Sequence, residues 1–242
     1  MALVTGGATG IGAATVAALA EAKITVALQY SSSENEAKQI SEQLNSKGLK
    51  VEIFRADLSQ KDCADELVAS VKAKLGDIDI LINNAGLMSD ASIIEMSDEL
   101  WDQALNINLT AAFKLIRACA PSMVSKKWGR IINISSQVAL VGSANHAHYA
   151  AAKAGLLGLT YSAAKEYGAS GVTVNAVLPG RIQTNMIAQR SKGRLDEWLA
   201  QTPLNRLGKP EEVAGMINFL ASEMASYVTG ASINVNGGLV MG

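Results

Sequence analysis

Short apolar segments alternate with helix-like segments along nearly the whole chain of 242 residues. Successive strands separated by helices are typical of parallel sheets, because a parallel connection must cross back over a face of the sheet. The sequence therefore predicts an α/β fold with a doubly wound parallel sheet of about seven strands and helices on both faces. We expect strands at 2–5, 24–29, 51–55, 78–82, 130–134, 172–177 and 231–235, and helices at about 11–22, 34–47, 60–75, 98–124, 148–167 and 211–221.

One segment interrupts this alternation. No linker, repeat or low-complexity tract divides the chain, so we expect a single domain over residues 1–242. Residues 185–208 follow Pro179-Gly180 and mix apolar with basic side chains in an irregular pattern. Insertions beyond the carboxyl end of a strand often cover the substrate in α/β enzymes. A helix pair that only covers the core is an equal alternative.

Composition excludes several classes of function. The net charge of -1 gives no electrostatic case for binding nucleic acid or an anionic membrane. Two cysteines without C-x-x-C spacing and two histidines predict neither a disulfide framework nor a metal site. No apolar run reaches about 18 residues, and the first residues read as a strand without a basic leader. We therefore expect a cytoplasmic protein.

A glycine-rich turn follows the first expected strand. Thr5-Gly6-Gly7-Ala8-Thr9-Gly10-Ile11-Gly12 leads into an alanine-rich helical segment. In such a strand–turn–helix unit, backbone N–H groups and the helix N-terminus can bind a diphosphate. Gly6 would permit the sharp turn, Gly10 would leave room for phosphates, and Gly12 would let the helix pack closely on the strand. The spacing predicts dinucleotide binding in a Rossmann-like fold, with an ordinary glycine loop as the alternative.

Tyr149 and Lys153 stand four residues apart in an alanine-rich run without proline. Residues at this spacing share one face of a helix. A cation close to a phenol favours the phenolate, which brings the pKa of a tyrosine from about 10 toward the working range of an acid–base catalyst. Taken alone, the pair fits a surface tyrosine beside a solvated lysine better than a catalytic pair.

These features together resemble the short-chain dehydrogenase/reductase family over essentially the whole chain. The family's motifs occur in the expected order. Within the family, the sequence is most similar to the branch of β-ketoacyl-carrier-protein (3-oxoacyl-carrier-protein) reductases. The matching stretches are Thr5 to Gly12, Asp57, Asn83-Asn84-Ala85-Gly86, Asn108, Gly129 to Ser136, Tyr149 to Gly155, Val172 to Asn175, Pro179-Gly180 and Val235 to Gly238.

The resemblance implies four catalytic residues. Tyr149 matches the general acid that protonates the carbonyl oxygen. Lys153 matches the lysine that lowers the tyrosine pKa and hydrogen-bonds the nicotinamide ribose. Ser136 matches the serine that binds the substrate oxygen, with Ser135 as its structural neighbour. Asn108 matches the asparagine that bends its helix and holds a water of the proton relay.

The same resemblance implies the cofactor contacts. Asp57 matches the residue that binds the adenine amino group, with a helix-start carboxylate as the less favoured alternative. Asn84 would stabilise the central sheet, Gly86 would let the cofactor pass, and Thr184 would contact the nicotinamide carboxamide. The full expected set is Thr5, Gly6, Thr9, Gly10, Ile11, Gly12, Ser31, Ser32, Asp57, Leu58, Asn84, Ala85, Gly86, Tyr149, Lys153, Pro179, Gly180, Ile182 and Thr184.

The end of the second strand favours NADP(H) over NAD(H). A site for NAD usually places Asp or Glu there to bind the ribose 2′-hydroxyl. This chain has Ser31, Ser32 and Ser33 instead, and no acidic residue before Glu34. The serines can donate hydrogen bonds to a 2′-phosphate, yet no cation is present at Thr9 or Ser31 to pair with it. They can also be plain loop residues.

The resemblance predicts NADPH-dependent reduction of a 3-oxoacyl group carried on acyl-carrier protein, in fatty acid synthesis, by a homotetramer. The alternatives are a reductase or dehydrogenase of another ketone, sugar, quinone or secondary alcohol, and a non-catalytic dinucleotide sensor. Lys126, Lys127 and Arg130 are expected either to receive an acidic carrier beside the active-site mouth or to end a helix. His146 and His148, just before Tyr149, contact substrate or simply form part of the loop.

Overall fold

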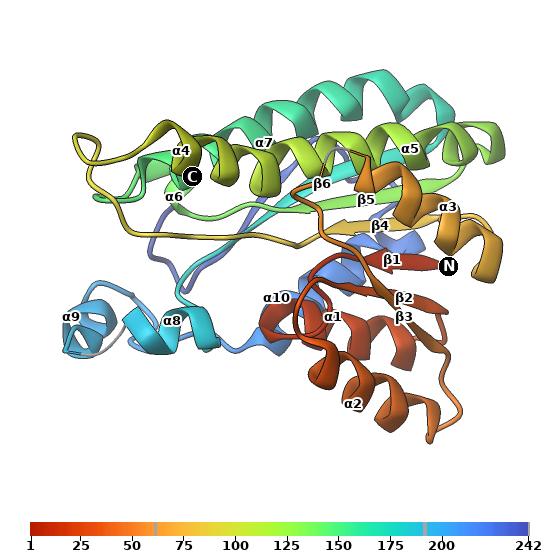
Figure 1. Cartoon of the computed structure of the whole chain (residues 1–242), viewed down its shortest axis with the longest axis horizontal. Helices are drawn as coiled ribbons and strands as arrows, with labels where there is room; N and C mark the ends of the chain where they lie inside the picture. The colour runs from red at the N-terminus through yellow and green to blue at the C-terminus, as the bar shows by residue number, and fades with distance from the viewer. Residues whose placement is uncertain (61, 191–192, 242) are drawn as a thin grey trace.

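Seven parallel strands form one sheet with the order β3-β2-β1-β4-β5-β6-β7. The computed structural model describes residues 1–60, 62–190 and 193–241. The chain therefore has the predicted α/β, Rossmann-like architecture in a single domain (Figure 1). The strands are β1 Ala2–Val4, β2 Val26–Tyr30, β3 Val51–Arg55, β4 Ile80–Asn83, β5 Gly129–Ile134, β6 Val172–Pro179 and β7 Ser232–Val235.

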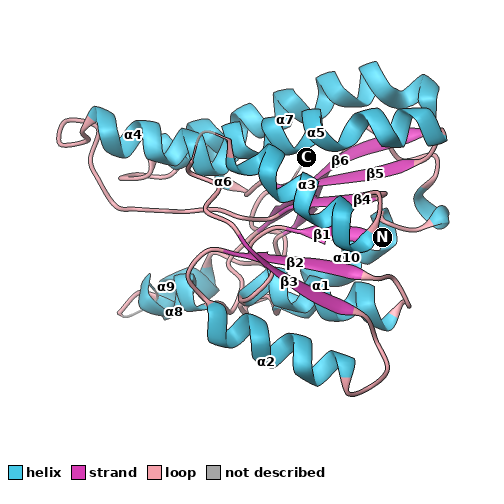
Figure 2. Ribbon diagram, turned by 45° about the vertical axis from the view of Figure 1, so that its right-hand side comes forward, coloured by secondary structure: helices cyan, strands magenta, loops and turns pink. Residues whose placement is uncertain are grey.

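Helices cover both faces of this sheet (Figure 2). Helices α1, α2 and α10 lie on one face, and α3, α5 and α7 lie on the other. The α-helices of the described chain are α1 Gly10–Glu21, α2 Glu34–Asn45, α3 Cys63–Leu75, α4 Asp98–Leu105, α5 Ala111–Lys126, α6 Val138–Val141, α7 Ala147–Tyr167, α8 Asn185–Arg190, α9 Leu195–Ala200 and α10 Pro210–Leu220.

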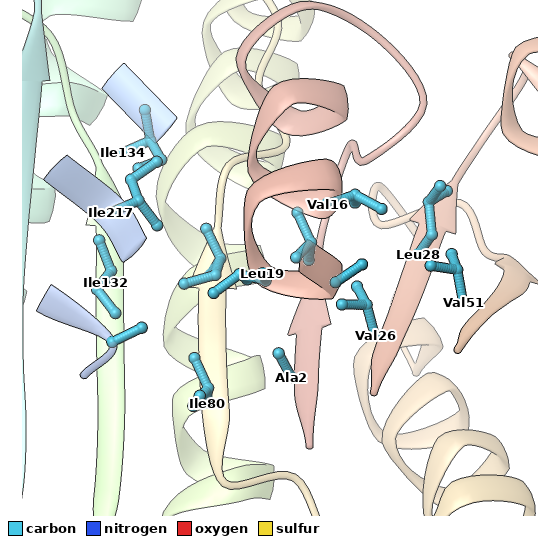
Figure 3. Close-up of a cluster of buried hydrophobic side chains, with 14 of the residues drawn as sticks. Ala2, Val16, Leu19, Val26, Leu28, Val51, Ile80, Ile132, Ile134 and Ile217 are labelled. Atoms are coloured by element: carbon cyan, nitrogen blue, oxygen red, sulfur yellow. The ribbon is translucent and has the colours of Figure 1, made fainter. Parts of the chain in front are cut away.

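Each face of the sheet has its own apolar core. Val16 and Leu19 of α1 and Ile217 of α10 pack on one face of the strands, all fully buried (Figure 3). Leu115 of α5 and Val71 of α3 are as completely buried on the other face. Burial of one such side chain contributes about 1.5–3 kcal/mol. Because both faces are covered, the strands are mostly apolar rather than alternating, which explains why they were visible in the sequence.

The order of the strands reverses at β1, which lies between β2 and β4. In doubly wound sheets, ligands bind outside the carboxyl ends of the strands at such a reversal. We call this side of the sheet the carboxyl edge and the opposite side the amino edge. Helices α6, α8 and α9 lie beyond the carboxyl edge, away from the N-terminus (Figure 1).

The expected helix at 98–124 is wrong as a continuous α-helix. It is interrupted between α4 and α5 by a π-helical turn, Asn106–Thr110. The Asn108 side chain donates to the carbonyl of Ala104, four residues earlier, at 2.9 Å. Side chains that compete for backbone carbonyls bend helices, and π turns are frequent at functional sites.

Candidate active site

The glycine-rich turn after β1 has the backbone that the sequence predicted. Gly6 and Gly10 adopt positive φ angles of 60° and 53°. Such angles are unfavourable for residues with a Cβ atom. A Cβ atom on Gly12 would overlap the carbonyl oxygen of Gly6. The three glycines therefore keep the loop tight against the first turn of α1, with Thr9 exposed at its outer surface.

The segment after β4 is bonded to this loop. The Asn84 side chain donates to the carbonyls of Thr5 and Gly6 at 2.9 and 3.1 Å. The buried Thr5 hydroxyl accepts from the backbone N–H groups of Asn84 and Ala85, each at 3.0 Å. These bonds join the ends of two neighbouring strands at the reversal of strand order. Thr5 and Asn84 thus hold the walls of the crevice together.

Gly86 lines the crevice next to Asn108 and Lys153. A Cβ atom at Gly86 would lie 2.8 Å from Asn108 Oδ1 and 3.5 Å from Lys153 Nζ. A larger residue would therefore press on Asn108 and touch Lys153. The absence of a side chain keeps the crevice open in front of them.

Tyr149, Lys153 and Ser136 line one cavity of about 300 Å³ at the carboxyl edge. Tyr149 and Lys153 come from the first two turns of α7, and Ser136 follows β5. The Lys153 ammonium lies 5.6 Å from the centroid of the Tyr149 ring. The structure thus brings the two residues together on one helix face, as their spacing predicts.

Lys153 is a buried cation. Its side chain donates to the carbonyl of Ile134 at 2.8 Å, and the residue is only 3% exposed. Burial lowers the pKa of Lys153 from 10.5 to about 8, because desolvation disfavours the charged form. Neither a carboxylate ion pair nor a hydrogen bond to a carboxylate is formed by this lysine in the described chain. A charge held at such a cost is typical of a functional group.

Asn108 lies directly behind these groups in the π turn. Its amide accepts from Leu87 N–H at 3.1 Å and donates to the Leu87 carbonyl at 2.8 Å. The side chain is buried, whereas Asn106 of the same turn is exposed. The structure therefore separates the two asparagines, and only Asn108 supports the wall of the crevice.

Ser135 and Ser136 also differ in their surroundings. The buried Ser135 hydroxyl donates to the Lys153 carbonyl at 2.8 Å, so it ties β5 to α7. Both serines border the cavity, but the Ser136 hydroxyl is only half-buried and accepts from Val138 N–H at 3.3 Å. This arrangement favours Ser136 over Ser135 as the group that reaches a ligand.

A second cavity of about 300 Å³ continues the first along the glycine-rich loop. The two share Gly6, Thr9, Ala85 and Gly86, so they form one elongated crevice. The first also contains the expected residues Gly10, Ile11, Asn84, Pro179, Gly180, Ile182 and Thr184. The second contains Ser31, Ser32, Asp57 and Leu58. Thr5, Gly12 and Asn108 line neither cavity and support the walls from behind.

Asp57 does not begin a helix, because α3 starts at Cys63. Its carboxylate accepts from the Ser59 hydroxyl at 2.7 Å, from Gln60 at 3.1 Å and from Ser59 N–H at 3.0 Å. These bonds hold the pKa of Asp57 below its usual value. The carboxylate stays ionised and exposed at the mouth of the second cavity, where it can accept a hydrogen bond.

Sequence reasoning missed several lining residues. Gln29, 2% exposed, accepts from Gly6 N–H at 2.8 Å and donates to the Ala56 carbonyl at 2.7 Å. A polar residue inside an apolar strand was the signal for it. Met88, Gln137 and Arg181 also border the first cavity. Arg181 donates to the Trp198 carbonyl at 2.7 Å and stacks on its ring, which ties α9 to the loop after β6.

The expected basic cluster beside the mouth is wrong within one chain. Lys126, Lys127 and Arg130 lie at the amino edge, and strand β5 places Arg130, six residues before Ser136, about 20 Å from it. Arg130 is 2% exposed, stacks on Trp128 and binds Glu223 at 3.4 Å. It is a structural arginine, because Trp128, Glu223 and the Gly129 carbonyl contact its guanidinium within the chain.

The two histidines have different environments. His146 contacts Asp90 at 2.7 Å and Ser143 at 2.9 Å, and it precedes α7. His148 is fully buried, and neither ring nitrogen has a partner in the described structure. Neither residue lines the first cavity. Of the two roles that the sequence left open, substrate contact or loop structure, the geometry favours the structural role.

The described chain also lacks two features. No group of three or more His, Cys, Asp or Glu side chains within it is gathered to hold a metal ion. None of its helices has the length and hydropathy needed to cross a membrane.

The fold and the crevice define a dinucleotide-binding oxidoreductase of the short-chain dehydrogenase/reductase type. A family model described as enoyl-(acyl carrier protein) reductase matches residues 6–240. The chain therefore belongs to the short-chain dehydrogenase/reductase family.

Relatives of known description match over the full length. A 3-oxoacyl-(acyl-carrier-protein) reductase of Salmonella typhimurium is 41% identical and covers 100% of this chain and 97% of its own length. The enzyme of the same description from Staphylococcus epidermidis is 38% identical. The match covers 99% of this chain and 98% of that enzyme. The similarity thus includes every element of the crevice.

Two solved structures have the same fold. A blue fluorescent protein from a metagenomic library, in complex with NADPH, gives a TM-score of 0.94 at 38% identity and covers 99% of this chain and 97% of its own. A protein from Beutenbergia cavernae, described as a putative NAD(P)-dependent gluconate 5-dehydrogenase with NADP bound at low occupancy, gives a TM-score of 0.94 at 34% identity. The match covers 98% of this chain and 95% of that one. One scaffold therefore carries proteins of different substrate descriptions.

Proposed function

We propose that this protein reduces the 3-oxo group of an acyl thioester, carried on acyl-carrier protein, to the 3-hydroxy group with NADPH. The observation that carries the proposal is the position of Tyr149, Lys153 and Ser136 on one cavity that continues the glycine-loop crevice. The substrate class rests on the descriptions of the full-length relatives. Fatty acid synthesis is the process in which such a reaction is used.

The residues present fit a dinucleotide. Gly6, Gly10 and Gly86 leave open the path that a diphosphate and a nicotinamide would follow. At the other end, Ser31 and Ser32 border the second cavity, and the nearest acid along the chain, Glu34, is paired with Lys38 at 2.6 Å. Hydroxyls at the end of β2, where an NAD site usually has a carboxylate, suit a 2′-phosphate better than a bare ribose. Both solved relatives were described with NADPH or NADP, which supports the same choice.

Bound NADPH would supply the hydride. Ser136 would donate a hydrogen bond to the carbonyl oxygen, and the Tyr149 hydroxyl would give that oxygen its proton. The Lys153 charge would stabilise the resulting phenolate, and Asn108 would keep the adjacent π turn in place. General acid assistance of this kind typically contributes about 10²- to 10⁴-fold to the rate.

One experiment separates the candidate substrates. NADPH oxidation at 340 nm is followed with acetoacetyl-carrier protein, acetoacetyl-coenzyme A, ethyl acetoacetate, 5-ketogluconate and a crotonyl thioester. We expect the largest kcat/KM with the carrier-linked 3-oxo substrate. A preference for 5-ketogluconate would favour a sugar-acid reductase, and a preference for the crotonyl thioester would favour reduction of a C=C bond. NADPH binding without any turnover would favour the sensor.

We further propose that the segment 185–208 covers the substrate. Its described parts include α8, whose Ile187 borders the first cavity, whereas residues 191–192 lie outside the described chain. The homotetramer and the cytoplasmic location also stay predictions. Exposed Trp101 and Phe113 on α4 and α5, and Tyr161 on α7, are compatible with an assembly through these helices. Light scattering on the purified protein measures its mass.

A further inference from the structure

Two loops at the carboxyl edge are held together by a polar contact that the proposed chemistry does not use. One loop, residues 84–97, runs from β4 to α4, and the other, residues 142–146, joins α6 to α7 (Figure 1). His146 Nε2 lies 2.7 Å from Asp90 Oδ1, and His146 Nδ1 lies 2.9 Å from Ser143 Oγ. Ala91 N–H also donates to the Asn145 carbonyl at 2.9 Å. The start of α7 is thus fastened to the loop after β4.

The direction of these bonds fixes the imidazole. An ionised carboxylate can only accept hydrogen bonds, so Nε2 must carry the proton that Asp90 receives. In the neutral ring, Nδ1 then accepts from the Ser143 hydroxyl. Both ring nitrogens of His146 are therefore engaged, and its side chain is only 14% exposed. The ring cannot turn without losing both contacts.

His146 stands at the N-cap of α7, three residues before Tyr149. Its carbonyl accepts from Ala150 N–H at 2.9 Å and closes the first turn of the helix. Tyr149 lies within that turn. Any movement of His146 is thus transmitted through one helical turn to the phenol.

From this geometry we propose that Asp90 and His146 form a positioning pair that holds Tyr149 in place for proton transfer. The inference rests on the proposed reduction, in which Tyr149 is the acid. Neither residue touches the substrate; Asp90 acts through His146, and His146 acts through the first turn of α7. The pair also gives a reason for a histidine at position 146 that the sequence left open.

The exposure of Asp90 predicts that its removal affects the reaction rate more than the folding stability. Asp90 is 64% exposed, and exposed ion pairs contribute little to folding stability. Misplacement of a catalytic group by about 1 Å can cost about 100-fold in rate. Removal of Asp90 should therefore lower kcat while leaving the melting temperature and NADPH binding nearly unchanged.

The test compares Asp90→Ala with a control in the same loop. Glu95 accepts from the Ser92 hydroxyl at 2.7 Å, a bond that is local to the loop and does not reach α7. We expect Asp90→Ala to lower kcat about tenfold, with KM and the NADPH dissociation constant within about twofold. Glu95→Ala should keep kcat within about twofold, and Asp90→Asn, which retains an acceptor oxygen, should recover most of the lost kcat.

A double-mutant cycle identifies the partner. If Asp90 acts only through His146, then Asp90→Ala combined with His146→Ala should be no slower than His146→Ala alone. If the kcat losses of the two single variants multiply in the double variant, the two residues act separately, and the proposed pair is overturned. Retention of more than about a third of kcat by Asp90→Ala, or an equal loss in Glu95→Ala, would also overturn it.

A second readout does not depend on activity. The chain has two histidines, so ¹⁵N-histidine NMR resolves two imidazoles. We expect Asp90→Ala to change the Nε2 signal of His146, which loses a direct contact, more than the signals of His148, whose ring nitrogens have no hydrogen-bond partner in the described structure. An unchanged spectrum would show that the contact does not form. Wild-type protein that reduces none of the carbonyl substrates would overturn the proposed function, whereas the NMR result still decides whether the pair exists.

Discussion

Two lysines at opposite edges of the same sheet have pKa values shifted in opposite directions. At the amino edge, Lys126 pairs with Asp79 at 2.8 Å and Asp77 at 3.2 Å, and these carboxylates raise its pKa. At the carboxyl edge, Lys153 is buried against the Ile134 carbonyl, and burial lowers its pKa to about 8. The amino edge therefore pairs its lysine with carboxylates. The carboxyl edge instead buries the ammonium of Lys153 without a carboxylate partner, and this burial costs folding free energy.

The difference indicates that the carboxyl edge holds the functional site, whereas the charges of the amino edge serve folding stability. The amino edge also pairs the N-terminal ammonium with Asp79 at 2.7 Å and Arg130 with Glu223, so its charges are satisfied by partners within the chain. The carboxyl edge instead combines an uncompensated cation with an open crevice and glycines at positive φ. Perturbed titratable groups in a cleft are typical of catalytic sites.

The largest effect should come from the carboxyl edge. Tyr149→Phe keeps the ring and its packing and removes only the hydroxyl. We expect kcat to fall by about 10²- to 10⁴-fold, or roughly 3–5 kcal/mol of barrier, with the melting temperature and NADPH binding nearly intact. Steady-state rates with NADPH and its 4-deuterated form measure this. A variant that keeps more than about a third of kcat, with a full isotope effect, would show that Tyr149 is not the acid.

Lys153→Met should lower both kcat and NADPH affinity, because the ammonium is proposed to serve both. Its effect on stability depends on pH. Between pH 8 and 10.5 the unfolded lysine is protonated and the folded one is not, so wild-type stability rises with pH across this range. We expect the wild type to gain up to about 3 kcal/mol relative to the variant.

Urea unfolding at pH 7.5 and pH 10 gives this difference directly. Comparing the two proteins removes the contribution of other titrating groups, which they share. A difference that does not change with pH would mean that Lys153 is not held in a desolvated site, and the contrast between the two edges would fail.

Much of the fold could be predicted because both faces of the sheet are covered. The strands are apolar runs, and the glycine-rich turn has a fixed relation to the first of them. The π turn at Asn106–Thr110 could not be located, because it depends on bonds from Asn108 to Leu87 and Ala104 that only the folded chain brings together. The misplaced basic cluster has a similar origin: Arg130 is near Ser136 in sequence, yet a strand carries them to opposite edges.

The catalytic candidates were predicted better than the groups around them. Tyr149 and Lys153 are four residues apart, so their proximity follows from helix geometry alone. Asp90 and His146 are 56 residues apart, and no local pattern indicates their contact. Gln29 left a faint signal as a polar residue in an apolar strand, but its partners Gly6 and Ala56 depend on the arrangement of three strands.

His148 should give a smaller effect at the carboxyl edge. Burial lowers its pKa, as does the nearby His146 when charged, whereas Asp90 opposes the shift. Below about pH 6.5 the unfolded histidine binds a proton that the folded one resists, so stability should fall with falling pH. His148→Gln should reduce this loss between pH 7.5 and 5.5 in urea unfolding. An equal loss in both proteins would assign the pH dependence to other groups.

The smallest effect should come from the amino edge. Lys126 is 43% exposed, and removal of an exposed ion pair typically costs about 0.2–1 kcal/mol. Lys126→Met should therefore lower stability slightly at pH 7 and leave kcat and NADPH binding unchanged. Because a raised pKa stabilises only the protonated lysine, its contribution should disappear as the pH rises above 10.5. A clear loss of kcat in this variant would connect the amino edge to the reaction. The contrast between a structural amino edge and a catalytic carboxyl edge would then be wrong.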